Sequence, residues 1–161
     1  MVSDKALQEL AVPKVRVVVV NFNGGDITLR CVDALRVTQF PRESLEIVVV
    51  DNGSTDGVTS ILKERYPEVV VVESATNEGF ARGCNLALRD LDGVDFVALI
   101  NNDALVEPNW LEPLLAGFIH ARVGAVCPKL LLNLHAHAVL LQPSELSELP
   151  DGRLVGARVD R

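Results

Sequence analysis

The stretch VVVVNFNGG, residues 17–25, changes abruptly from four valines to asparagine, phenylalanine and glycine. An unbroken apolar β-branched run bounded by turn residues predicts a strand that is buried on both faces, as in parallel sheets covered by helices. The polar residues after the valines would then lie at the carboxyl end of a buried strand. We therefore expect a functional site at Asn21, Phe22 and Asn23.

The same pattern of apolar run, polar turn and helix recurs along the chain. Further strands are predicted over residues 45–50, 69–72, 94–100 and 124–132. Helices are predicted over residues 27–38 and 58–66, within residues 77–93, and over residues 109–120. Strands that alternate with helices imply right-handed crossovers. The expected fold class is α/β, with a mostly parallel, doubly wound, Rossmann-like sheet and helices on both faces.

Polar clusters follow four of the predicted strands. They are Asn21–Asn23, Asp51–Asp56, Asn77–Asn85 and Asn101–Asp103. Ligands of doubly wound sheets bind outside the carboxyl ends of the strands. The four clusters are therefore expected to border one shared crevice.

Composition limits the classes of partner. The chain has 161 residues, 48% of them hydrophobic, which is enough for one domain with a sizeable core. Its net charge of −7 argues against a nucleic-acid partner and against electrostatic docking on anionic lipid. Three scattered cysteines, Cys31, Cys84 and Cys127, predict buried free thiols in a reducing cytosol. The charged N-terminus does not resemble a signal peptide, and charges interrupt the apolar region 111–141, which argues against a membrane span.

The segment DNGSTDG, residues 51–57, has two compatible interpretations. Asp51 can accept a hydrogen bond from a ring N–H or a ribose hydroxyl, and Gly53 permits a turn that a side chain would block. Alternatively, the segment is a strand-to-helix turn in which Ser54 or Thr55 is the N-cap and Asp56 lies in the first helical turn.

The segment INND, residues 100–103, also leaves two alternatives open. A carboxylate at the end of a buried strand, flanked by amides, suits a hard cation that keeps several waters and bridges phosphate oxygens. Alternatively, Asn101 and Asn102 form an Asx turn, and Asp103 caps the helix that follows.

The segment NEGFARGCN, residues 77–85, combines two glycines with Arg82 near a helix start. Backbone N–H groups and a guanidinium at a helix start are able to bind a diphosphate. The spacing fits neither the GxGxxG fingerprint of dinucleotide sites nor the P-loop.

Four stretches in this order resemble one family. VVVVNFNG, IVVVDNGSTDG, NEGFARGCNLAL and FVALINNDALVEPNWLEPLL are similar to the nucleotide-sugar-binding part of the inverting family 2 glycosyltransferases, which have the GT-A fold. The chain looks most like their rhamnosyltransferase and galactofuranosyltransferase branch. The resemblance implies a UDP- or dTDP-linked sugar donor, a glycan or lipid-linked acceptor, and a role in cell-wall or surface polysaccharide synthesis. It also implies a location in the cytoplasm or at the inner face of the plasma membrane.

The resemblance also implies roles for single residues. Asn21 would lie at the nucleotide edge and Asp51 would bind the base. Asp103 would bind Mg²⁺ or Mn²⁺, because Asn101, Asn102 and Asp103 stand where the family has its Asp-x-Asp motif, with Asn101 replacing the first acidic residue. The other residues expected to contact the nucleotide-sugar are Asn23, Gly53, Ser54, Asn77, Gly79, Arg82, Asn85, Asn101 and Asn102.

The family also needs a carboxylate base in a segment well downstream of the metal triplet. PDGRLVG, residues 150–156, resembles the Asp-Gly hairpin before the acceptor half. We expect an N-terminal extension over residues 1–14, the donor domain over 15–132, an incomplete acceptor-side region over 133–161, and a base beyond the chain end. The alternatives are a catalytically inactive nucleotide-binding or interaction module and, ranked last, a nucleotidyltransferase. Self-association into a homo-oligomer is also expected.

Overall fold

The structure is a computed structural model that describes residues 12–120, 122–134, 137–139, 146–148 and 154–156. The chain divides into two compact units, of which the first ends at Gly124 and the second begins at Ala125.

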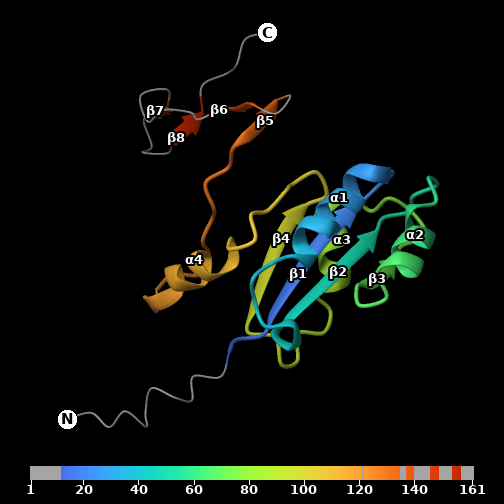
Figure 1. The fold of residues 1–161 in the computed structure, drawn as a ribbon, viewed down its shortest axis with the longest axis horizontal. Helices are drawn as coiled ribbons and strands as arrows, with labels where there is room; N and C mark the ends of the chain where they lie inside the picture. Colours follow the sequence, from blue (N-terminus) through green and yellow to red (C-terminus); the bar gives the residue numbers. More distant parts are fainter. Residues whose placement is uncertain (1–11, 121, 135–136, 140–145, 149–153, 157–161) are drawn as a thin grey trace. The chain divides into compact units, whose positions relative to one another are not determined.

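The first unit is built on a four-stranded sheet in the order β3-β2-β1-β4, and every neighbouring pair is parallel (Figure 1). The strands are β1 (Val15–Asn21), β2 (Leu45–Asp51), β3 (Val70–Glu73) and β4 (Phe96–Asn101). The helices are α1 (Gly25–Arg36), α2 (Val58–Arg65), α3 (Gly79–Ala87) and α4 (Leu111–Ala116), with short 3₁₀ turns η2 (Arg42–Ser44) and η3 (Gly117–Ile119). The predicted α/β class with a parallel sheet is confirmed.

The valine run of β1 is buried because helices cover both faces of the sheet. Val17 and Val19 pack on one face, in a cluster with residues of α1 and α2. Val18 packs on the other face, in a cluster that contains Ala87 of α3. Burial of one such side chain contributes about 1.5–3 kcal/mol, so the run anchors the carboxyl end of β1 firmly.

The edge strand β4 is covered on one face only. Phe96, Ala98 and Ile100 pack against the cluster of α1 and α2. Val97 and Leu99 point to the face that α3 covers over the neighbouring strands, and they are 38% and 50% exposed. Within the described residues, this part of the sheet face has no covering helix.

The second unit contains two short antiparallel pairs. β5 (Leu132–Leu134) pairs with β6 (His137–Val139), and β7 (Leu146–Glu148) pairs with β8 (Leu154–Gly156). The strand predicted over residues 124–132 is wrong, because the backbone is irregular up to Leu131. Pro128 lacks the N–H that a ladder needs, and Leu130 is 79% exposed. Asp151 and Gly152 of the predicted hairpin lie outside the described residues.

Two further features of the described residues are the character of the helices and the burial of the cysteines. No helix in the described part of the chain has the length and apolar character needed to cross a membrane. Cys31 and Cys84 are buried free thiols as predicted, but Cys127 is exposed, so the prediction is wrong for that residue.

Candidate functional site

The strand register brings three of the predicted polar clusters to one edge of the sheet. Asn21 at the end of β1 is the register partner of Asp51 at the end of β2. On the other side of β1, Val20 is the partner of Asn101 at the end of β4. Parallel strands of matched register therefore place the Asn21, Asp51 and Asn101 positions side by side.

The side chain of Asn21 is completely buried and makes five hydrogen bonds. Its Oδ1 accepts from Thr28 Oγ1 at 2.6 Å, from the backbone N–H of Gly24 at 3.2 Å and from Asn102 Nδ2 at 3.4 Å. Its Nδ2 donates to Asp51 Oδ1 and to Ser54 Oγ, both at 3.0 Å. Asn102 Nδ2 also donates to Thr28 Oγ1 at 3.1 Å. We call Asn21, Thr28, Asp51, Ser54 and Asn102 the Asn21 cluster.

The loops after β1 and β2 are joined by further hydrogen bonds. Asn23, which has a left-handed backbone with φ of 51°, donates its N–H to Ser54 Oγ and accepts from the N–H of Thr55 at 2.8 Å. Asp56 accepts from the N–H groups of Gly25 and Val58. The predicted N-cap role of Ser54 or Thr55 is wrong, because these residues bond the first loop and α2 begins after Gly57.

Asp51 is fixed within this network. Its side chain is almost completely buried, with the residue 4% exposed. Oδ1 accepts from Asn21, and Oδ2 accepts from the N–H of Ser54 at 3.2 Å. A carboxylate has about four acceptor sites, so each oxygen keeps capacity for one more donor.

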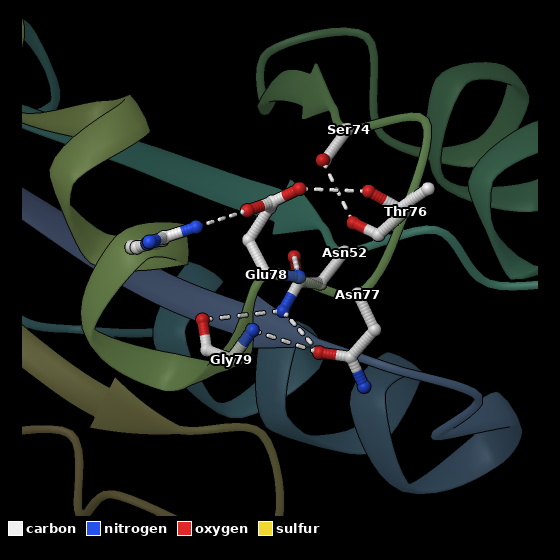
Figure 2. Close-up of polar contacts among 7 residues, drawn as sticks. Asn52, Ser74, Thr76, Asn77, Glu78 and Gly79 are labelled. Carbon is white, nitrogen blue, oxygen red and sulfur yellow. Dashed lines mark hydrogen bonds and ion pairs between the residues drawn. The ribbon is translucent and has the colours of Figure 1, made fainter.

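The loop before α3 is held by Asn52, a residue that the sequence analysis did not single out. Figure 2 shows its amide between Asn77 and Gly79. Asn52 Nδ2 donates to Asn77 Oδ1 at 2.9 Å and to the carbonyl of Gly79 at 3.3 Å, and its Oδ1 accepts from the N–H of Glu78 at 3.0 Å. Asn77 Oδ1 also accepts from the N–H of Gly79. The loop after β3 is thereby tied to the end of β2.

Two glycines permit close contacts in the site. A Cβ on Gly53 would lie 2.9 Å from the backbone carbon of Thr76, and Gly53 has a left-handed φ of 81°. A Cβ on Gly24 would lie 2.3 Å from Thr28 Oγ1 and 2.4 Å from Asn102 Nδ2. Side chains at these positions would push apart the loops that form the site.

Arg82 and Asn85 lie on the outward face of α3. Arg82 donates to Glu78 Oε2 at 2.9 Å, but its side chain stays 77% exposed. Hydrogen bonds from Thr76 and Arg82 lower the pKa of Glu78. Figure 2 shows the bond between Thr76 and Glu78. Arg82 and Asn85 line a groove together with Ser74, Leu86 and Arg89.

The triplet that follows β4 forms a turn, in which the N–H of Ala104 donates to the carbonyl of Asn101 at 3.0 Å. The alternative in which Asp103 caps the next helix is wrong, because α4 begins at Leu111. Asp103 is exposed, and no group of three metal-ligating side chains occurs among the described residues. A single exposed carboxylate fits a cation that takes its other oxygens from water and phosphate.

The thiol of Cys31 lies beneath this turn and donates to the carbonyl of Asn101 at 3.5 Å. Burial, together with the negative charge of Asp103, raises the pKa of Cys31 to about 12. Cys31 is therefore a neutral packing group and not a nucleophile or metal ligand.

Two exposed aromatic rings lie next to the polar loops. Phe22, directly after β1, is 48% exposed, and Phe80, in the first turn of α3, is 51% exposed. The sequence placed Phe22 in an expected functional site without a specific role, and it assigned no role to Phe80. An aromatic residue in a polar turn at a strand end is the signal that points to Phe22, because burial does not explain its position.

A family model described as "Glycosyl transferase family 2" matches residues 16–134. The chain is also 38% identical, over 69 residues, to the poly(ribitol-phosphate) beta-glucosyltransferase of Bacillus spizizenii. That alignment covers 41% of this chain and 11% of the relative. Residues 16–134, which the family model matches, contain every residue of the Asn21 cluster.

Two solved structures have a similar fold. The mannosyltransferase PcManGT from Pyrobaculum calidifontis, in complex with GDP-Man and Mn²⁺, is 32% identical with a TM-score of 0.53, over 60% of this chain and 29% of that one. TarS of S. aureus, in complex with UDP-GlcNAc, is 26% identical with a TM-score of 0.58, over 64% of this chain and 30% of that one.

The chain spans between 9% and 34% of the length of the curated relatives that it matches. The substrates of those whole enzymes are therefore not assigned directly to this chain.

Proposed function

This chain belongs to glycosyl transferase family 2, and on that basis we propose that it forms the donor-binding domain of a glycosyltransferase. The enzyme transfers a sugar from a nucleotide-diphospho-sugar to an acceptor hydroxyl, with inversion at the anomeric carbon. The acceptor is a glycan or a lipid-linked sugar of a cell-wall or surface polysaccharide, handled in the cytoplasm at the inner face of the membrane. The rhamnosyltransferase-like branch remains our preferred subgroup.

One observation carries this proposal. The buried amide of Asn21 joins Asp51, the candidate base-binding residue, to Asn102, which precedes the candidate metal ligand Asp103. A nucleotide-diphospho-sugar needs both a base site and a diphosphate site, at a fixed separation. The complexes of the two structural neighbours, one with GDP-Man and Mn²⁺ and one with UDP-GlcNAc, support a donor of this class.

Asp51 and Phe22 are proposed to bind the base. The Asp51 carboxylate keeps free acceptor capacity for a ring N–H, as in uracil or thymine. The exposed ring of Phe22 offers an apolar face on which a base stacks, an interaction worth about 1–3 kcal/mol. Asn23, Gly53 and Ser54 shape this part of the site.

The loop before α3 is proposed to lie along the ribose and the diphosphate. Arg82 is largely exposed and able to form paired hydrogen bonds with phosphate oxygens. Asn77, Gly79 and Asn85 line the same side, and Asn52 keeps the loop in place.

Asp103 is proposed to hold Mg²⁺ or Mn²⁺, with Asn101 and Asn102 beside it. Such an ion supplies charge neutralisation for the departing nucleotide diphosphate. The contribution of the chain's own residues is binding and orientation. No described residue is proposed as the base that deprotonates the acceptor.

A second candidate function is a nucleotide-binding or interaction module without transferase activity. The observation that favours it is the uncovered face of β4, where Val97 and Leu99 are exposed. An apolar sheet face of this kind is a common contact surface between proteins, including copies of one chain.

Isothermal titration of UDP, dTDP and GDP into the chain, first with Mn²⁺ and then with EDTA, tests the donor site. Asp51→Ala should weaken binding in both conditions, by about 1–3 kcal/mol for a charged hydrogen bond left unmade. Asp103→Ala should remove mainly the metal-dependent part of the affinity. Asp92→Ala, at an exposed aspartate in the loop before β4, is the matched control and should bind like the wild type.

Each outcome has a defined meaning. If none of the nucleotides binds, the donor site is contradicted, and the interaction module is the function that stays proposed. Equal losses from Asp103→Ala with and without Mn²⁺ contradict the metal assignment. Transfer or hydrolysis of the bound sugar nucleotide contradicts the module, whereas metal-dependent binding alone is the result expected of both the donor-binding domain and the module.

A further inference from the structure

The amide of Asn21 has only one favourable orientation. Its oxygen faces three donors, and its nitrogen faces two acceptors, one of them the Asp51 carboxylate. A rotation that exchanged oxygen and nitrogen would place a carbonyl against Asp51 and an NH₂ group against the N–H of Gly24. The complete burial of Asn21 makes either mismatch costly.

The two ends of this amide lead to different parts of the proposed donor site. The nitrogen leads to Asp51 at the end of β2. The oxygen leads, directly and through Thr28 Oγ1, to Asn102 in the turn after β4. Thr28 is completely buried in α1, so the helix and the two strand ends share one small polar cluster.

We propose that Asn21 is a positioning residue that couples recognition of the base to binding of the metal–diphosphate unit, with Thr28 as its link to the metal-side turn. This inference rests on the proposed function. Asn21 itself is buried and is not expected to touch the donor, which distinguishes this role from the direct nucleotide contact that the family resemblance implies.

The coupling follows from the cost of ordering the turn. A donor that holds Asp51 through its base and Asp103 through its diphosphate must bridge a fixed distance. UDP bound through Asp51 without metal does not need the Asn101–Asp103 turn, whereas metal-dependent binding at Asp103 does. If the turn were free, only the metal-dependent step would have to order it, at a cost in conformational entropy. Because the Asn21 cluster holds the turn beforehand, the gain in UDP affinity from metal should be larger when the cluster is intact, and linkage makes this effect reciprocal.

Thr28→Val tests the link by titration of UDP with Mn²⁺ and with EDTA. The substitution keeps the shape of the buried side chain but removes the hydroxyl that bonds both Asn21 and Asn102. UDP affinity in EDTA should change less than about twofold, whereas the gain in affinity from Mn²⁺ should fall about five- to tenfold, as expected for the loss of a buried hydrogen bond.

Two matched variants separate this effect from general destabilisation. Thr28→Ser retains the hydroxyl and should retain the Mn²⁺ gain. Thr38→Val makes the same chemical change at another buried threonine, whose Oγ1 accepts from Trp110 Nε1 at 3.0 Å, and it should also retain the gain. Circular dichroism establishes that each variant is folded.

Asn102→Ala removes the other partner of the bond to Thr28. Because Asn102 is only partly buried, this variant should tolerate the change better, and it serves as the test if Thr28→Val does not fold. Combined with Thr28→Val, it should reduce the Mn²⁺ gain no further than either single change does, since both break one link. A wild-type chain that binds none of UDP, dTDP and GDP overturns the proposed function and this inference with it. A wild type with a clear Mn²⁺ gain that Thr28→Val and Asn102→Ala both leave intact overturns the inference alone.

Discussion

Gly24→Ala should destabilise the protein although alanine suits the backbone at this position. Gly24 has φ of −85° and ψ of −13°, an ordinary right-handed conformation. Its added Cβ would nevertheless lie 2.3 Å from Thr28 Oγ1, 2.4 Å from Asn102 Nδ2 and 2.6 Å from Asn21 Oδ1, well inside contact distance. The three polar atoms cannot all move away without breaking the bonds among them.

The magnitude follows from two opposing contributions. Overpacking costs about 1–3 kcal/mol, and the loss of one or two buried hydrogen bonds adds about 1 kcal/mol each. Alanine also restricts the unfolded chain more than glycine does, which stabilises the folded protein by about 0.4–1 kcal/mol. These ranges combine to a net loss of about 1–4.5 kcal/mol, with a central value of about 2–3 kcal/mol. With an m-value of about 2 kcal/mol/M, the urea midpoint should fall by about 1–1.5 M.

Urea denaturation followed by circular dichroism measures this shift, and Gly124→Ala provides the control. Among the described residues other than its two chain neighbours, no atom lies within 4 Å of a Cβ at Gly124, and its backbone is not left-handed. The control midpoint should therefore stay near that of the wild type. A Gly24→Ala variant with an unchanged midpoint would refute the tight packing of the Asn21 cluster.

Three further predictions concern other parts of the first unit and one residue of the second. Iodoacetamide at pH 8 should modify the exposed Cys127 in the native protein and spare Cys31, whose pKa burial raises to about 12; equal labelling by mass spectrometry would contradict this. Burial and the hydrogen bond to Asp33 raise the pKa of Tyr66, so the folded state keeps a proton that the unfolded state loses. Stability should therefore fall as the pH rises above about 10, and Tyr66→Phe should remove this part of the alkaline loss in denaturation at pH 8 and pH 10.5; identical pH dependence in both proteins would contradict the assignment. Asn52→Ala should speed hydrogen exchange at the N–H groups of Glu78 and Gly79, since both belong to the network that Asn52 holds, while exchange in β1 stays slow; unchanged exchange at Glu78 would contradict that role.

The order of strands and helices was predictable because it depends on local apolar patterns. Residues 17–19 and 47–50 are buried on both faces, as apolar β-branched runs indicate. The same reasoning failed at residues 124–132, where an apolar run contains Pro128 and forms no strand up to Leu131. Apolar composition alone does not supply the partner strand that a ladder requires.

The position of the candidate site at the strand ends was predictable from the sequence, but the hydrogen bonds within it were not. Strand-end position pointed to Asn21, Asp51 and Asn102, since parallel register aligns such positions. Spacing along the chain does not show that Asn21 is buried and bonds its neighbours, nor that Ser54 bonds the first loop in place of capping α2. Thr28 was missed because a threonine on the apolar face of a helix has no distinctive sequence signal.

The position of β1 between two partners from different parts of the chain also has a consequence for biosynthesis. Asn21 and Asn102 are 81 residues apart. At ribosomal rates of about 5–20 residues per second, β1 emerges about 4–16 s before the turn that completes its polar cluster. During that interval the nascent chain can pair β1 with β2, while the other edge of β1 has no β4 to bond. The hydrogen bonds of the Asn21 amide are therefore completed only after residue 102 has emerged, and a ribosome stalled before residue 102 should present a β1 edge that is open to chaperones.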